Sequence, residues 1–338
     1  MKIKINGVFY DFFDDIAVTY KLGSVASVFS FKARFNPKND FHKAIFKPLA
    51  YNKVEIFSDD DELLFTGTSV NTSLASNSLR ELQAISGYSK AGILEDCSIP
   101  YSSYPLEKID VSLDDILSNI LSVFDIKYII ENSARNDTNL VYKKSIAQPS
   151  ESVKAYISKL AAQRNIVITN NEKGDIVLFK PDFNQKPKLF LDKENSLTMS
   201  LNVNGQAMHS EISIIRQPSK DNTSITPVDT ALNNLVGKKR TLVKVLSSGT
   251  ETDTKKASNN AIAAELSNIS IKVLLKRIEA IRVGDIVEVQ NDEIYLYNKA
   301  RLVVSEVAIK QTSNSEEMSL SLLLPESFTG KTPKNIFL

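Results

Sequence analysis

The length, composition and charge of the chain exclude several classes of protein. With 338 residues and 42% hydrophobic content, it can bury more than one core and is not a disordered chain. Its 41 basic and 40 acidic residues leave a formal net charge of +1, whereas a dedicated nucleic-acid binder needs a basic excess for phosphate contacts.

Cysteine content and hydropathy indicate where the chain folds. The single cysteine, Cys97, has no partner for an internal disulfide, which fits folding in a reducing cytoplasm. No apolar run approaches the ~18 residues of a spanning helix, and the first residues lack the apolar run of a signal peptide. We therefore expect a soluble protein with no membrane anchor and no cleaved signal.

The first part of the chain has the pattern of β-strands. Residues 54–57 (Val-Glu-Ile-Phe) and 62–65 (Glu-Leu-Leu-Phe) flank an acidic turn at 58–61, which predicts a hairpin. Further strands are predicted at 26–31 and 79–85. Together these elements indicate a first β-barrel domain over residues 1–105.

The middle of the chain changes to a helical period. Apolar residues from Leu113 to Phe124 recur at three- and four-residue spacing, and Ser112 with Asp115 forms a capping-box pair at the start. A second helix is predicted after Pro149, and a hairpin over 166–179 follows it. Residues 106–185 are therefore expected to form an α+β domain. The buried stripe of the second helix should consist of Val153, Tyr156, Ile157, Leu160 and Ala161.

The last part of the chain returns to strands and turns. Strands are predicted at 197–203 and 211–215, a polar loop at 217–227, and an alanine-rich helix at 257–266. Residues 186–338 are expected to form a second β-barrel domain that carries the loop and the helix. The fold class is thus mainly β with an α+β insert, as two tube-like β-barrel domains flanking a helix-plus-hairpin domain. A four-strand meander is predicted from 283–289, 294–297, 302–309 and 318–324.

Two hairpins of the chain resemble each other. Residues 287–290 (Val-Glu-Val-Gln) and 293–296 (Glu-Ile-Tyr-Leu) flank an acidic turn, as 54–57 and 62–65 do. Alternation and acidic turns are common, so chance explains such a pair as well as duplication does. If the similarity is real, the two β regions are copies of one barrel.

The residues that bind metals in proteins are scarce in this chain. Its two histidines, His42 and His209, lie far apart in sequence, and one cysteine cannot complete a zinc site. The acidic run at 59–62 has Leu64 and Val70 where a calcium loop needs glycine and glutamate. As a charged turn in water, it also lacks the environment that separates the pKa values of a glycosidase acid pair.

Nucleophile and phosphate motifs are incomplete. Ser89 lies in a segment, Gly87 to Gly92, that resembles a nucleophile elbow, but the second glycine comes one position late. Gly237 is followed by two lysines without the upstream glycine of a phosphate loop. We predict no catalytic, cofactor-binding or metal-binding residues and no enzymatic activity. The short basic clusters at 238–240, 255–256 and 276–277 are expected to be solvated faces.

A series of short motifs follows one another in a fixed order along the chain. They are 27–31 (Ser-Val-Phe-Ser-Phe), 64–67 (Leu-Phe-Thr-Gly), 86–89 (Ser-Gly-Tyr-Ser) leading to 94–96, the 150–161 helix feeding 174–181, 283–285 (Val-Gly-Asp) and 320–328. In this order and spacing the chain resembles the Mu-type phage tail protein family, the baseplate hub proteins of contractile-tailed phages and related injection particles. Two features depart from the family pattern: the chain has no tryptophan, and the 217–227 loop has no clear place.

The resemblance implies a structural role in a virion. It implies a homotrimeric ring in the tail baseplate, assembled in the host cytoplasm, that joins a tail tube or tube-initiator protein to a spike protein. Other baseplate proteins would contact the ring, and the genome would pass through its channel without specific binding. Two alternatives remain open from the sequence: a tail-associated cell-wall hydrolase and a free-standing binding or adhesion module.

Overall fold

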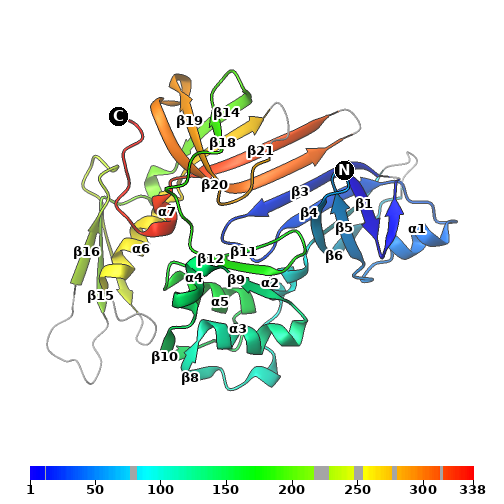
Figure 1. The fold of residues 1–338 in the computed structure, drawn as a ribbon, viewed down its shortest axis with the longest axis horizontal. Helices are drawn as coiled ribbons and strands as arrows, with labels where there is room; N and C mark the ends of the chain where they lie inside the picture. The colour runs from blue at the N-terminus through cyan, green and yellow to red at the C-terminus, as the bar shows by residue number, and fades with distance from the viewer. Residues whose placement is uncertain (12, 77–81, 217–227, 247–253, 276–279, 313–314) are drawn as a thin grey trace.

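The computed structural model describes residues 1–338 except 12, 77–81, 217–227, 247–253, 276–279 and 313–314 (Figure 1). Most of its regular structure is β, and an α+β unit lies beneath the main sheet. The predicted fold class, mainly β with an α+β insert, is confirmed. The predicted loop at 217–227 lies outside the described residues.

One 13-stranded sheet joins the two β regions of the chain. Its hydrogen-bonded order is β14-β18-β21-β20-β3-β4-β7-β6-β5-β1-β2, and β19 pairs with both β20 and β13. The first β region gives β1 (Lys2–Ile5), β2 (Val8–Tyr10), β3 (Phe13–Lys21), β4 (Val28–Ala33), β5 (Lys53–Phe57), β6 (Leu63–Ser73) and β7 (Gln83–Ser89), with α1 (Asp40–Ile45) between β4 and β5. The second gives β13 (Leu189–Leu191), β14 (Ser196–Val203), β18 (Ile269–Leu275), β19 (Ile286–Asn291), β20 (Leu296–Gln311) and β21 (Glu316–Leu323), followed by α7 (Glu326–Thr329).

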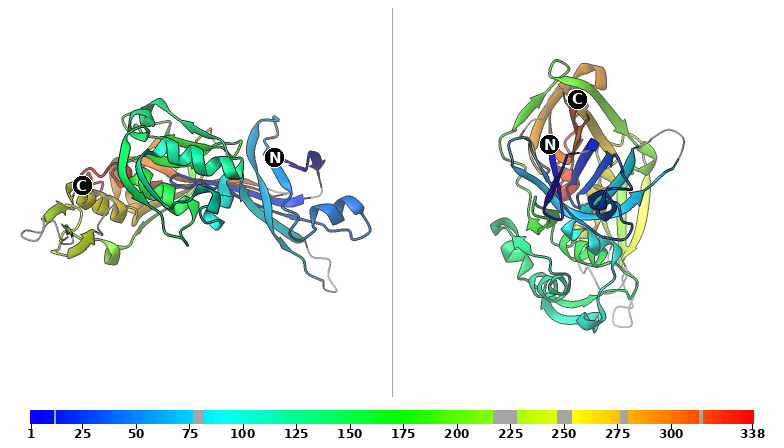
Figure 2. Two further views of the ribbon diagram at one scale, coloured as in Figure 1. Left: turned by 90° about the horizontal axis from the view of Figure 1, so that it is seen from below. Right: turned by 90° about the vertical axis from the view of Figure 1, so that its right-hand side faces the viewer.

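Each β region curls around its own apolar core (Figure 2). The alternating pattern of β4, with Phe29, Phe31 and Ala33 buried, turns one face of the sheet toward the first core. The same alternation in β18 and β21 supplies the second core. Tyr20 and Ile309 contact both cores, so they connect the two regions where β3 pairs with β20.

The α+β unit has the two predicted helices. Helix α3 (Leu113–Leu121) begins with the predicted capping box, in which the Ser112 hydroxyl accepts from the Asp115 amide at 3.1 Å and the Asp115 carboxylate accepts from the Ser112 amide at 3.0 Å. In α5 (Val153–Ala162) all five residues of the predicted stripe are buried. The predicted hairpin is β11 (Val167–Asn170) with β12 (Ile176–Phe179). The unit is completed by β8 (Glu107–Ser112), β9 (Tyr128–Ile130), β10 (Val141–Ile146), α2 (Ile93–Asp96), α4 (Asn132–Thr138) and the short 3-10 helices η1 (Lys90–Gly92), η2 (Tyr101–Ser103) and η3 (Ser122–Phe124).

A small satellite unit with its own core interrupts the second β region. The sequence predicted only one strand, a polar loop and a helix here, whereas the structure forms a three-stranded sheet that buries Ile212 and Ile214 against a helix. The satellite consists of β15 (Glu211–Arg216), β16 (Val228–Leu232), β17 (Thr241–Leu246) and α6 (Thr254–Leu266), preceded by η4 (Gly205–Ala207).

The predicted four-strand meander is wrong in one detail. The end of the predicted strand at 294–297 and all of the predicted strand at 302–309 belong to one strand of 16 residues, β20, which begins at Leu296. No glycine or proline stands between them to end the strand, and β20 absorbs a bulge after Val304 without stopping. The turn before β20 is η5 (Asp292–Ile294), so the meander has three strands.

The two β regions repeat one strand order. The order β3-β4-β7-β6-β5-β1 in the first region corresponds to β14-β18-β21-β20-β19-β13 in the second. The predicted likeness of the two regions is therefore confirmed at the level of topology. The repeat is inexact at its end, because β1 pairs antiparallel with β5 whereas β13 pairs parallel with β19. The satellite is inserted between β14 and β18, which correspond to β3 and β4. In the first region only a short turn connects β3 to β4.

The pairing registers of the two regions also agree. The β6–β7 pairing slips after Ser69 opposite Gly87, and the β20–β21 pairing slips after Val304 opposite Leu322. In this register Val54 corresponds to Val287, as the sequence comparison predicted. Phe65 corresponds to Ala300 rather than to Leu296, because the second hairpin is longer at its turn.

A second shift in pairing register occurs at corresponding places in the two regions, in the strand pairs β3–β4 and β14–β18. The β3–β4 pairing slips between Phe13 and Asp15, and the β14–β18 pairing slips between Ser196 and Thr198. β-Bulges are positional features of a fold, so two shared bulges support one duplicated barrel.

The core clusters bear on the division into domains. The first core lies within residues 1–85 and the second within 191–324, while the core of the α+β unit extends from Ala91 to Leu178 and also includes Val25. We retain the division into 1–105, 106–185 and 186–338 as a proposal, with a satellite inside the third part.

Candidate assembly surface

Ser89 of the incomplete elbow and the histidine His209 both make structural contacts. Ser89 ends β7 before a short helical stretch, where it is fully buried and its hydroxyl accepts the Ser27 amide at 3.1 Å. His209 belongs to the satellite, where its Nδ1 lies 2.8 Å from a Glu265 carboxylate oxygen. Ser89 and His209 therefore make their hydrogen bonds in two different units of the structure.

Replacing Ser89 with alanine should therefore change no hydrolytic activity. Its hydroxyl is out of reach of solvent and already bonded within the sheet. The measurement is release of soluble fragments from peptidoglycan and of product from an ester substrate by the purified protein and by Ser89→Ala. Activity that disappears in Ser89→Ala would contradict a structural role for this serine.

The remaining polar candidates also support the fold. The Asp59 carboxylate lies 2.6 Å from the N-terminal amine, and Asp61 lies 2.7 Å from the Lys2 ammonium, so the acidic turn holds β1. The His42 ring is buried, and its Nδ1 accepts the Asn36 amide at 3.2 Å. Among the described residues, no three His, Cys, Asp or Glu side chains cluster as metal ligands.

The predicted basic clusters are only partly described. In the cluster at 238–240, Arg240 donates to the carbonyls of Met208 and Gln206 at 2.9 and 3.0 Å, so it ties the satellite together. The cluster at 276–277 lies outside the described residues. None of the described helices is long and apolar enough to cross a bilayer.

Within the described part of the chain, one face of the main sheet is not covered by an apolar core. Opposite the two apolar cores, the strands from β14 to β6 carry mostly small and polar side chains. Two ion pairs balance charges there, Lys21 with Glu306 at 3.2 Å and Lys32 with Asp15 at 3.3 Å. We call this surface the polar face. Its small and polar members include Ala17, Thr19, Ser30, Ser86, Ser200, Asn202, Ser270, Ala308, Ser319 and Ser321.

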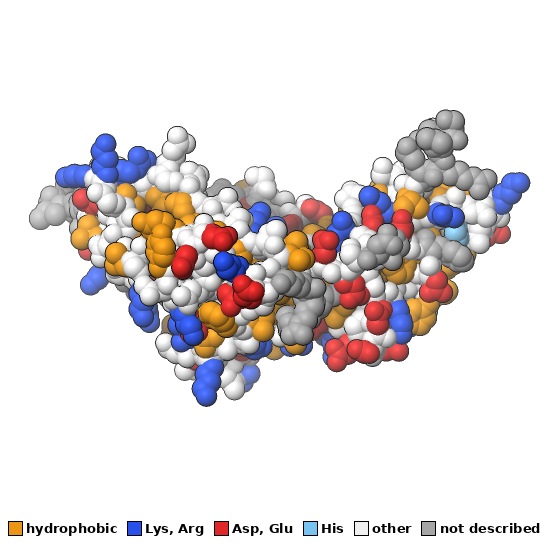
Figure 3. Space-filling model, turned by 90° about the horizontal axis from the view of Figure 1, so that it is seen from above, with side chains coloured by type: hydrophobic (Ala, Val, Ile, Leu, Met, Phe, Trp, Pro, Cys, Tyr) orange, Lys and Arg blue, Asp and Glu red, His pale blue; other side chains and the backbone are white. Residues whose placement is uncertain are grey.

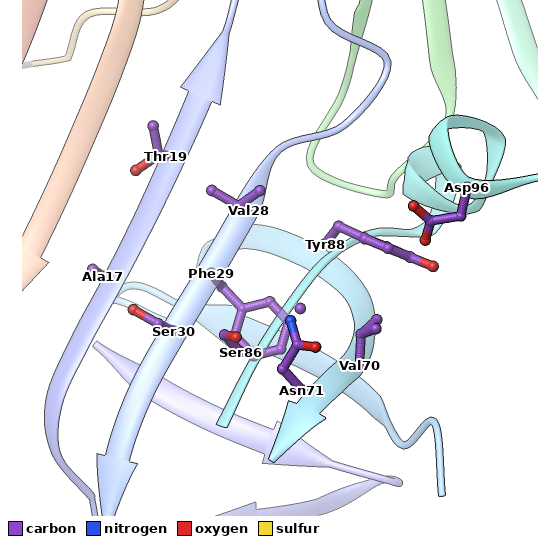
Figure 4. Close-up of a pocket in the computed structure, with 11 residues that line it drawn as sticks. Ala17, Thr19, Val28, Phe29, Ser30, Val70, Asn71, Ser86, Tyr88 and Asp96 are labelled. Atoms are coloured by element: carbon purple, nitrogen blue, oxygen red, sulfur yellow. The ribbon is translucent and has the colours of Figure 1, made fainter. Parts of the chain in front are cut away.

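The polar face is hollowed within the first β region (Figure 4). The hollow has a volume of about 580 Å³, and Thr19, Ser30, Ser86 and Asn71 line it from four neighbouring strands. At its end Tyr88 points toward Asp96 of α2. Burial and the hydrogen bond to Asp96 raise the pKa of the Tyr88 hydroxyl above its usual value, so Tyr88 stays neutral. Small and polar side chains share the lining of this concave surface with Val28, Phe29 and Val70.

Two edges of the run from β14 to β6 are open within the described part of the chain. β14 pairs only with β18, so its outer edge has no partner strand. β6 pairs with β5 only as far as Thr68, so Thr72 and Leu74 extend past the end of β5 on that side. Open edges present unpaired backbone groups and invite pairing with another strand.

Apolar side chains stand at both open edges. Leu74, just after β6, is 46% exposed, and Val203 at the end of β14 is 49% exposed. The satellite carries a further apolar surface on the outer side of its sheet, at Leu232, Val243 and Val245. The space-filling view shows two lobes with a dip between them, and charges of both signs are mixed over the surface (Figure 3).

One family model matches the chain. Residues 91–180 match the second domain of the gp44-like baseplate hub proteins. These residues enclose the core of the α+β unit, apart from Val25. A search of curated protein sequences finds no match.

Solved structures share the fold over the whole chain. The prophage MuSo2 43 kDa tail protein from Shewanella oneidensis matches with a TM-score of 0.81 and 16% identity, over 96% of this chain and 98% of that one. The tail protein from Neisseria meningitidis matches with a TM-score of 0.78 and 15% identity, over 97% of both chains. An Escherichia coli type VI secretion component described as similar to the bacteriophage T4 tail proteins gp27 and gp5 matches with a TM-score of 0.56 and 10% identity, over 99% of this chain and 80% of that one.

The predicted resemblance is thus confirmed by two independent comparisons. The sequence match covers the α+β unit, and the structural matches at low identity cover the fold of all three parts. The chain thus carries a segment similar to the second domain of the gp44-like baseplate hub proteins, and its whole fold is similar to that of the two tail proteins.

Proposed function

We propose that the chain is a structural hub of a contractile tail baseplate or related injection particle, working as a homotrimeric ring rather than as an enzyme. The observation that carries the proposal is the duplicated barrel within one continuous sheet. Three copies would present six similar barrels, so a threefold hub could meet a sixfold tube with matching surfaces.

The open edges support a closed ring. One edge belongs to β14 and the other to β6, so a contact between them joins unlike surfaces. Such a heterologous contact gives a ring when the rotation closes, and pairing within the ring covers both of these edges.

The polar face supports a channel. Strands β5, β1 and β2 and strands β19 and β13 continue the sheet around the two cores, so the bulk of each region lies on the apolar side. A closed ring has room for that bulk only outside, which puts the polar face toward the lumen. Mostly small and polar side chains, with two ion pairs among them, would line such a lumen, in keeping with passage of a genome without specific binding.

The descriptions of similar solved structures support a proposal for the partners of this chain. Two solved structures with a TM-score of at least 0.54 are Francisella PdpA–VgrG complexes, and the E. coli relative is described as similar to T4 gp27 and gp5. By analogy, the hub would contact a spike protein on one side, a tail tube or tube-initiator protein on the other, and further baseplate proteins around it. These contacts would place the chain in the tail baseplate of the particle.

The mass of the purified protein in solution tests this proposal. We expect light scattering to give three times the chain mass of 37.6 kDa over a range of protein concentrations. A particle that stays a monomer, or one that contains two or four copies, would contradict the trimeric hub.

A further inference from the structure

The joint between the two β regions inside the chain has a defined pairing. Where β20 meets β3, Glu306 lies opposite Lys21, Val307 opposite Tyr20, and Ile309 opposite Val18. Ile309 and Tyr20 each contact both cores. This joint is therefore held by an antiparallel strand pair with apolar side chains that bridge two cores.

The duplicated register identifies the counterparts of this joint. Counted from the bulges that the two regions share, Leu74 takes the place of Ile309, and Ser73 takes the place of Ala308. On the other strand, Val203 takes the place of Tyr20, and Asn202 takes the place of Thr19. All four counterparts lie on the open edges of the same chain.

The exposed apolar residues coincide with the bridging positions. Ile309 and Tyr20 are packed between two cores, whereas Leu74 and Val203 are 46% and 49% exposed. The backbone around Leu74 is also prepared for extended pairing, since the Gln83 side chain bonds the Ala75 amide and carbonyl at 2.6 and 3.1 Å from the β7 side. Within the described part of the chain, no strand pairs with the opposite side of this segment.

We infer that the occupant of these edges is a second copy of this chain, which pairs its β14 antiparallel with residues 71–76 in the register of the internal β20–β3 joint. Thr72 then faces Val203 of the next copy, Ser73 faces Asn202, and Leu74 faces Leu201. This inference rests on the proposed ring and adds the residues and the register that close it. Around the ring, the strand pairing within each copy would then alternate with the strand pairing between copies, and both would have the same register.

The internal joint also predicts which facing residues can be cross-linked. The Leu22 amide donates to the Ser305 carbonyl at 2.7 Å, so by antiparallel alternation Thr19 and Ala308 form a non-hydrogen-bonded pair. The corresponding pair is Ser73 with Asn202 of the next copy. Non-hydrogen-bonded partners have Cα atoms about 4.5 Å apart, within the range of a disulfide.

The experiment combines Ser73→Cys with Asn202→Cys in a Cys97→Ser background and oxidises the assembled protein. We expect covalent trimers on a non-reducing gel, with no larger species, because three bonds close the ring. Protein with Ser73→Cys alone or Asn202→Cys alone should not cross-link, whereas a mixture of the two should give covalent dimers.

Two control pairs of cysteines test the oxidation conditions and the pairing register. Thr19→Cys with Ala308→Cys should form a disulfide inside each chain, which shows that oxidation works at this geometry. Ser73→Cys with Thr198→Cys should not cross-link, because Thr198 lies about 13 Å further along β14 than Asn202.

The outcomes separate this inference from the proposed function. A trimeric mass without cross-linking of the Ser73 and Asn202 pair, while the internal control oxidises, would overturn the strand joint and leave the trimeric hub standing. A monomeric mass without intermolecular cross-links would overturn both. Cross-linking of the Thr198 pair in place of the Asn202 pair would show a different register and contradict the inference.

Discussion

Replacing Leu160 with alanine should lower the free energy of unfolding by about 2–5 kcal/mol, the usual range for a leucine deleted from a packed core. Leu160 lies on α5 with 2% of its surface exposed, inside the core of the α+β unit. The Leu160 carbonyl accepts a hydrogen bond from the Tyr142 hydroxyl at 2.8 Å. Because this bond fixes the helical turn, the surroundings should close poorly around the cavity that the substitution leaves. The measurement is a denaturant or thermal melt of the purified variant.

Leu140→Ala is the matched control for this change. Leu140 belongs to the same unit, but 56% of its surface is exposed, so the same deletion removes little burial. We expect its melt to lie close to that of the unchanged protein. A Leu160→Ala melt that is equally unchanged would show that this face of α5 is not packed.

Placing a charge at the open edge should dissociate the proposed ring without unfolding the chain. In Val203→Asp the carboxylate would be buried between two copies without a partner, which costs several kcal/mol at each joint, on the order expected for an unpaired buried charge. In the separate chain Val203 is half-exposed, so the same substitution should leave the melt of the monomer little changed. Light scattering should show the mass falling from three chains to one.

The satellite supplies a control for charge alone. Leu232 is 60% exposed on the outer side of the satellite sheet, which is separate from the 13-stranded sheet that has both open edges. We expect Leu232→Asp to keep the trimeric mass. A Val203→Asp protein that remains fully trimeric would mean that β14 does not take part in the contact between copies.

The elements with strong local signals were predictable from the sequence. The capping pair of Ser112 and Asp115 and the apolar period of α3 and α5 depend on residues within one or two turns, and the structure has both helices where they were predicted. The hairpin at 54–65 likewise follows from alternation around an acidic turn.

The long-range arrangement was not predictable in the same way. β20 was divided into two predicted strands, since polar residues such as Asn298 and Lys299 suggest a turn, although pairing with β19, β21 and β3 keeps the strand continuous. The satellite was missed because β16 and β17 are short strands whose stability comes from pairing with β15 and packing against α6. Tertiary contacts decided both cases.

The sequence pointed only indirectly to the open edges that we propose for assembly. The likeness of residues 54–57 to residues 287–290 predicted a duplication, and the pairing register of the two regions agrees with it. The sequence could not show which residues stand at the open edges. That requires the bulges at Ser69 and Val304, which appear only when strands are paired.

The most direct test of the hub is the view of the assembled particle along its axis. Averaged electron-microscopy images of the purified protein should show a ring of three copies, with six similar lobes around an open centre and the α+β units displaced from the ring wall. A compact particle without a central opening, or images with twofold or fourfold symmetry, would contradict the account of this chain as a baseplate hub.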